Sequence, residues 1–193
     1  MKPLGAVPLQ RPRRSGRGTP KLQLVRPDTS GSHAAIPPTA VAVRPDLSFQ
    51  VELFSAIVDE LPPLFARHWK ELGEQDIPLD PDWNRMFVME AQGQLKIITA
   101  RAGDVLVGYI FNFLGRHPHS RSSLYSTIDN FWLDPAYRGG LAVLRWLRMN
   151  DTVLDELGVK KRYIGIANDY MAGRVGNLFR RLGYKPVETT WSR

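Results

Sequence analysis

Residues 131–140 read Phe-Trp-Leu-Asp-Pro-Ala-Tyr-Arg-Gly-Gly, and this stretch decides the predicted fold. It completes an apolar segment, Leu124 to Leu133, that is typical of a strand. A helix is expected directly after it, from about Leu141 to Leu157, with Gly158 at the C′ position. Two glycines before a helix N-terminus allow the backbone to approach an anion closely. The stretch therefore predicts a strand, a phosphate-binding turn and a helix.

The rest of the chain from Thr39 onward alternates between strand and helix patterns, which predicts an α/β (α+β) fold with a mixed sheet flanked by helices. Phe49 to Leu72 follows a helical pattern that Pro62 and Pro63 divide into two helices. Further helices are expected at Pro81–Gln92 and Tyr170–Leu182. The other expected strands are Ala40–Val43, Leu95–Ala100, Val105–Leu114, Val159–Ala167 and Lys185–Trp191.

The positive charge of this 193-residue chain is concentrated at one end. Residues 1–38 hold seven Lys and Arg against one acid, Asp28, for a net charge of +6, and seven of the 15 prolines. Residues 39–193 carry 19 basic and 18 acidic residues, a net charge of +1. We therefore expect a basic, Pro-rich arm over 1–38, disordered or extended in isolation, and a globular domain over 39–193.

The composition also excludes several kinds of chemistry. The chain has no Cys, which rules out disulfides, thiol catalysis and Cys-ligated metal sites. The apolar runs are too short for a membrane-spanning helix, and Met1–Ser30 lacks the apolar core of a signal peptide. His117 and His119 flank Pro118, but two ligands with no nearby Cys, Asp or Glu make a poor metal site, so no metal is expected. A loop that contacts an acceptor or partner, or a solvated loop, is the preferred interpretation.

Two stretches together resemble signature regions of the GNAT (Gcn5-related N-acetyltransferase) superfamily. Phe131 to Gly140 is similar to the end of the central strand and the pyrophosphate loop, and Asn177-Leu-Phe-Arg-Arg-Leu-Gly-Tyr184 is similar to the closing helix. The resemblance covers roughly 39–193. It implies a mostly antiparallel central sheet and direct acyl transfer from acetyl-CoA to an amine that the sequence does not identify.

The resemblance also assigns candidate site residues. Asp129 aligns with a frequent acidic position on the central strand and is the candidate catalytic base, the alternative being a structural hydrogen bond. Asn168 is a candidate partner for pantetheine, or equally a helix N-cap. The other candidate cofactor-binding residues lie in the strand end and the loop: Phe131, Trp132, Leu133, Arg138, Gly139 and Gly140.

Three positions depart from the family pattern. Leu141 and Val143 stand where the loop normally has Gly and Gly or Ala, and Phe179 replaces the Tyr that protonates the departing thiolate. These departures favour a second interpretation, a GNAT-like domain without catalysis.

That second interpretation is a virion structural or accessory protein anchored by its arm. The chain looks closest to a divergent, bacteriophage-encoded branch of the superfamily, on four further stretches. These are His68–Glu71, Leu79–Trp83, His117–Leu124 and Pro186–Thr189. The expected location is the host cytoplasm or a phage virion. The arm is expected to contact other virion proteins, with nucleic acid a less favoured partner and a solvated extension without a partner as the third alternative.

Overall fold

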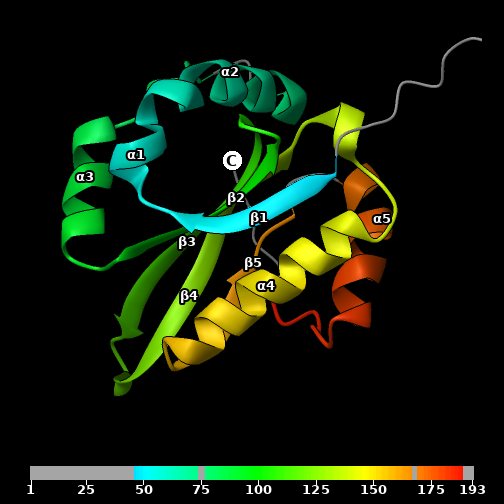
Figure 1. Ribbon diagram of the computed structural model, residues 1–193. Coiled ribbons are helices and arrows are strands. Elements are labelled where there is room, and N and C mark those ends of the chain that lie inside the picture. Colours follow the sequence, from blue (N-terminus) through cyan, green and yellow to red (C-terminus); the bar gives the residue numbers. More distant parts are fainter. Residues whose placement is uncertain (1–45, 74–76, 167–168, 189–193) are drawn as a thin grey trace, which may run out of the picture. The chain divides into compact units, whose positions relative to one another are not determined.

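The computed structural model describes residues 46–73, 77–166 and 169–188, with side chains left out at 169–172 and 174. One five-stranded sheet organises them, in the order β1-β2-β3-β4-β5 (Figure 1). Neighbours from β1 to β4 run antiparallel, and β4 and β5 run parallel. The strands are β1 (Leu47–Glu52), β2 (Leu95–Ala102), β3 (Val105–His117), β4 (Ser120–Leu133) and β5 (Val159–Ile164). The predicted mixed, mostly antiparallel sheet is confirmed.

Helices cover both faces of this sheet. Those before β2 lie on one face: α1 (Phe54–Ile57), the 3-10 turn η1 (Val58–Glu60), α2 (Leu61–Leu72) and α3 (Trp83–Ala91). Those after β4 lie on the other: α4 (Ala142–Glu156) and α5 (Asp169–Arg181), with the 3-10 turn η2 (Pro135–Tyr137) between β4 and α4. No helix in the described part of the chain is long and apolar enough to cross a membrane.

Alternating side chains divide the interior into two cores. On β2, Ile97 packs under α1 and α2, whereas Ile98 packs under α4. On β3 and β4, Tyr109, Phe111 and Trp132 belong to the first core. Trp146 of α4 is fully buried at the centre of the second and stacks on Phe49 at 5.9 Å. The central strands β2, β3 and β4 therefore contribute to both cores, as expected where a sheet is covered on both faces.

A β-bulge interrupts this alternation in the middle of β4. Phe111 of β3 pairs with Asn130, and the next residue, Asn112, pairs with Ile128, so Asp129 has no partner on β3. Ile128 and Phe131, three residues apart, consequently face the same core. A bulge re-aims a side chain and increases the local twist of the strand. Here it sets the segment 129–133 apart from the regular strand before it.

The structure corrects the prediction for 49–52, where β1 replaces the start of the expected helix. Leu47, Phe49 and Val51 alternate with polar residues, and the segment pairs with 97–102 of β2. The sequence predicts a helix at 49–52 because Phe54, Ile57 and Val58, in and just after α1, continue the same apolar spacing. Pairing with β2 favours the strand over the helix, and this pairing cannot be predicted from residues 49–52 alone.

Two other expected strands also differ from the structure. Residues 185–188 are not a strand, and β5 ends at Ile164 instead of Ala167. The expected strand Ala40–Val43, the arm, Asn168 and the end of the last expected strand lie outside the described residues. The remaining predicted elements match to within a few residues, α4 and α5 most closely.

Candidate functional site

The parallel strands β4 and β5 stop pairing half-way along β4. The last paired residues are Ile128 and Ile164, whereas β4 continues through Asp129 to Leu133 and stays hydrogen-bonded to β3. Within the described residues, no strand pairs with the β5-facing edge of segment 129–133. Backbone N–H and C=O groups on such an edge can pair with an extended ligand as they would with a peptide.

The loop after β4 turns the chain into α4. The Asp134 side chain accepts a hydrogen bond from the Ala136 N–H at 2.9 Å and so begins η2. Gly139 and Gly140 then adopt φ values of +125° and +62°, a region that other residues rarely enter. A Cβ added to either glycine would meet no atom within 4 Å, so conformation and not crowding requires glycine here.

The N-terminus of α4 follows these glycines without a capping side chain. Leu141 is the N-cap residue, is 73% exposed and makes no side-chain hydrogen bond to the helix. The first N–H groups of an α-helix have no partner within the helix and carry its positive dipole end. Val143, which stands where the family pattern has Gly or Ala, packs in the second core. The N-terminus of α4 thus has the features of an anion-binding site.

The candidate residues of β4 contribute backbone and not side chains to this edge. Phe131 and Leu133 pack in the second core and Trp132 in the first. Phe179 of α5 is also buried, 6.5 Å from Phe131 and 5.7 Å from Tyr184 between ring centroids. Phe179 has no hydroxyl, so this side chain cannot protonate a departing thiolate as the family's Tyr does.

Asp129 stands at the bulge with its side chain exposed. Its one hydrogen bond among the described residues comes from Asn130 Nδ2 at 3.4 Å, which is long. The alternative of a structural bond from a backbone group or an arginine is not seen in this part of the chain. Its carboxylate is accessible at the point where β4 and β5 separate.

Arg138 is engaged by the protein itself. Its Nη2 donates to Glu71 Oε2 at 2.6 Å, its Nη1 donates to Glu71 Oε1, and its Nε donates to the Leu133 carbonyl at 2.7 Å. Trp132 Nε1 also donates to Glu71 Oε2, at 2.8 Å. These bonds from Arg138, with a smaller contribution from Trp132, lower the pKa of Glu71 against the opposing effect of burial. Arg138 therefore fixes the loop to α2, and its role in cofactor binding stays a prediction.

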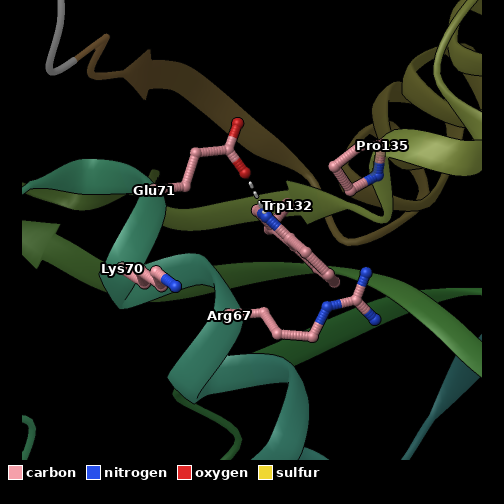
Figure 2. A pocket seen from close by; sticks show the side chains of 5 residues that line it. All are labelled: Arg67, Lys70, Glu71, Trp132 and Pro135. Carbon is pink, nitrogen blue, oxygen red and sulfur yellow. Dashed lines mark hydrogen bonds between the residues drawn. The ribbon is translucent and has the colours of Figure 1, made fainter.

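One turn of α2 forms the wall opposite this loop. Arg67 donates to Asp134 at 2.7 Å, and its guanidinium lies 5.1 Å from the centre of the Trp132 ring. Figure 2 shows Arg67 and Glu71 reaching from α2 towards Trp132, at the rim of a shallow hollow of about 410 Å³. Its lining residues are Arg67, Lys70, Glu71, Trp132 and Pro135.

His68 lies on the same turn, and its Nδ1 is 2.9 Å from the Tyr109 hydroxyl. Burial lowers the pKa of His68 to about 4, assisted by the positive charge of Arg138 and opposed by Glu71. Burial alone raises the pKa of Tyr109. Both groups are therefore neutral at physiological pH.

The structure joins seven of the eight candidate residues in one continuous segment from the bulge to the glycine pair. It adds three that the sequence analysis did not assign to the site: Arg67, Glu71 and Tyr109. The only available signal was the spacing of Arg67 and Glu71, four residues apart on one helix face. His117 and His119 lie at the β3–β4 hairpin, in a different part of the sheet.

No family model matches the sequence, and no curated protein matches it. Solved structures match well. A predicted acetyltransferase from Clostridium acetobutylicum, solved with acetyl-CoA, is 15% identical, with 77% of this chain and 96% of that chain covered and a TM-score of 0.61.

Two further structures give the same result. An aminoglycoside acetyltransferase from an uncultured soil metagenomic sample has a TM-score of 0.63 at 11% identity, covering 77% of this chain and 97% of its own. A GCN5-related N-acetyltransferase from Ralstonia eutropha has a TM-score of 0.55 at 13% identity, covering 77% and 98%. The part of the chain that the structure describes therefore shares the fold of these acetyltransferases.

Proposed function

We propose that this protein is an acyltransferase that moves an acetyl group from acetyl-CoA to an amine. One observation carries the proposal: the unpaired edge of β4, the Gly139–Gly140 turn and the uncapped end of α4 follow one another without interruption. The likeness to acetyltransferase structures, one of them solved with acetyl-CoA, supports the same reaction.

The residues present suit each part of acetyl-CoA. The positive φ angles of Gly139 and Gly140 and the free N–H groups at the start of α4 suit the pyrophosphate. The open edge of segment 129–133 suits the amides of pantetheine. Arg138 orients the loop and leaves the phosphate contacts to the backbone. Asn168, the remaining candidate for pantetheine, stays a prediction.

The thioester of acetyl-CoA supplies an activated acyl carbon. An acceptor nitrogen bonds to that carbon as the carbon–sulfur bond breaks, and the nitrogen must lose a proton. Asp129 is the carboxylate placed to accept it, because it is exposed at the end of the β4–β5 pairing. Phe179 has no hydroxyl, so the sulfur takes its proton from solvent. No covalent enzyme intermediate is required, consistent with a chain that lacks Cys.

The test is release of free thiol from acetyl-CoA in the presence of a panel of primary amines, compared between the natural chain and Asp129→Asn. We expect turnover in the natural chain and a loss of about a hundredfold in the variant, the range of a general base. Equal melting temperatures of the two chains confirm that folding is unaffected. An equally active variant would remove Asp129 from this role.

A second candidate function is a virion accessory protein of the bacteriophage-encoded branch, without catalysis. The buried phenyl ring of Phe179 and the engagement of Arg138 by Glu71 favour it. Residues 1–38, with a net charge of +6, would then form the tether. Deleting 1–38 is expected to abolish association with virion proteins and to leave the melting temperature of the remainder unchanged. Undiminished association of the truncated chain would end the tether proposal.

The arm also offers a sequence-independent attachment to nucleic acid. If the arm binds nucleic acid, its affinity for nucleic acid falls steeply as salt rises from low to physiological concentration, because counterions are released on binding. Binding that does not vary with salt would contradict this use of the arm.

A further inference from the structure

A second hollow lies on the sheet below the candidate active site, where the β3–β4 hairpin meets β5. Its volume is about 330 Å³, at the small end of the range of ligand pockets. In Figure 1 this hairpin points away from α2 and α5. Six residues of its lining matter here: Phe113, Gly115, His117, Tyr125, Thr127 and Tyr163.

The hollow occupies the sheet face opposite α4. Ser126 and Ile128 of β4 point towards α4, so Tyr125 and Thr127, which alternate with them, face the other way. On β5, Arg162 pairs with Asp151 and Asp155 of α4, which places Tyr163 on the face opposite. Among the described residues, the first core under α1 to α3 includes no residue of β5. These helices therefore leave this part of the face uncovered.

Aromatic rings line this uncovered face in a continuous row. His119 and His117 lie 5.4 Å apart between centroids, His117 stacks on Tyr125 at 5.3 Å and 30°, and Tyr125 lies 6.2 Å from Tyr163. Lys161 ends the row, with its Nζ 5.8 Å from the centre of the Tyr163 ring. Gly115 pairs with Tyr125 in the β3–β4 register and leaves the space beside that ring open.

Cations border the row, and the strands contribute no acid. Segments 115–128 and 158–164 contain no Asp or Glu. Arg116, Arg121, Lys160 and Lys161 form no ion pair with any residue that the structure describes. This surface has the aromatic rings and unneutralised positive charge that bind bases and phosphates, whereas a polycationic amine would be repelled from it.

We propose that this trough, the hollow bordered by the His119–Tyr163 ring row and these four cations, binds single-stranded nucleic acid. Bases would stack on the rings and phosphates would contact the cations of the hairpin and of β5. A strand fits better than a free nucleotide, because the row crosses from the hairpin to β5 and has cations at both ends. This site is separate from the acetyl-CoA edge, and the proposal does not depend on acyl transfer.

Gly115 offers a variant that fills the trough without disturbing the fold. A Cβ at this position meets no atom within 4 Å, and the φ angle is not positive, so Gly115→Phe places a ring in open space. A second variant, Lys161→Glu, reverses the cation that lies over the Tyr163 ring at the end of the row. Arg148→Glu is its matched control, because Arg148 is exposed on α4, against the opposite face of the sheet.

The experiment measures binding of a fluorescein-labelled oligothymidylate of eight nucleotides to the full-length chain by anisotropy. We expect Gly115→Phe to weaken binding between about fivefold and a hundredfold, the range of one lost base stack. Lys161→Glu should weaken it about three- to tenfold, and Arg148→Glu less than twofold. Melting temperatures verify that each variant is folded.

A double-stranded probe of the same length separates the trough from the arm, because charge attraction by residues 1–38 acts on both forms of DNA. Gly115→Phe should not change the affinity of the chain for the double-stranded probe. The proposal is overturned if Gly115→Phe binds the single strand as tightly as the natural chain, or if the natural chain does not bind it at micromolar concentration. It is also overturned if free thymidine monophosphate or an acidic aromatic peptide binds as tightly as the strand.

Discussion

Glu71 of α2 and Arg138 of the β4–α4 loop form a two-pronged ion pair, with Oε2 and Nη2 2.6 Å apart. The pair joins residues 67 positions apart in the chain and covers the edge of the Trp132 ring, whose Nε1 also bonds Glu71. Arg138, the cation of the loop motif, thereby fixes the loop to α2. The glycine backbone and the end of α4 remain for the ligand.

A double-mutant cycle measures this ion pair. Glu71→Gln, Arg138→Gln and the double variant should show a coupling energy of about 1 kcal/mol in urea unfolding, the upper end for a partly exposed pair. The side chains are 37% and 31% exposed, which limits the expected value. Coupling below about 0.3 kcal/mol would show that the pair does not hold the loop.

His68 should make stability depend on pH below its ordinary pKa. The pKa of His68 in the folded chain, about 4, lies below the ordinary histidine value of 6.5, so between these pH values the unfolded chain binds a proton that the folded chain does not. The contribution of neutral His68 to the free energy of unfolding is complete above about pH 6.5 and is lost as the pH falls to about 4. We expect the natural chain to lose about 2 kcal/mol more than His68→Gln across this interval. An NMR titration that gives His68 a pKa of about 6.5 would contradict its burial as a neutral group.

Asn150 should anchor α4 through a buried polar network. Its Oδ1 accepts from Asn112 Nδ2 at 2.7 Å, and Ser126 donates to Asn112 at 3.2 Å. Asn150→Leu leaves a buried donor without its partner, and we expect a loss of about 2 kcal/mol in the free energy of unfolding. Thr152→Ala, on the exposed side of the same helix, should change it by less than about 0.5 kcal/mol. Equal effects of the two substitutions would disprove the network's role.

Gly108 and Gly115 on β3 should lose very different amounts of stability when each is changed to Ala. A Cβ at Gly108 would lie 2.8 Å from Leu133 Cδ1 and from the Trp132 carbonyl, whereas one at Gly115 meets nothing within 4 Å. Gly108→Ala is therefore expected to cost about 1–3 kcal/mol, and Gly115→Ala less than about 0.5 kcal/mol. Thermal unfolding of the two variants checks both values, and a neutral Gly108→Ala would contradict the close approach of β3 and β4.

The part of the site that lies within one stretch of chain could be predicted from the sequence. Phe131 to Gly140 carries its own strand, turn and helix signals, so the loop and α4 were located to within a residue or two. The bulge at Asp129 depends on how β3 pairs with β4, and no local pattern encodes it.

Long-range partners explain what the sequence analysis missed. The ion pair of Arg138 with Glu71 cannot be predicted from the loop alone, because Glu71 comes from α2. The second core, in which Val143 packs, is built partly from β2 and β3, which lie far away in the sequence. Residues 49–52 fit a helical pattern locally, and their pairing partner, β2, begins more than forty residues later.

The most direct test of the account is calorimetric titration of acetyl-CoA into the full-length chain and into Leu141→Asp, with Leu141→Asn as the uncharged control. Leu141 is exposed, and a carboxylate in the first turn interacts favourably with the helix dipole, so the melting temperature should stay equal or rise. We expect micromolar affinity of the natural chain and of Leu141→Asn for acetyl-CoA, and an affinity at least about tenfold lower in Leu141→Asp, whose charge repels the pyrophosphate. No heat from the natural chain at millimolar acetyl-CoA, or unchanged affinity in Leu141→Asp, would contradict it.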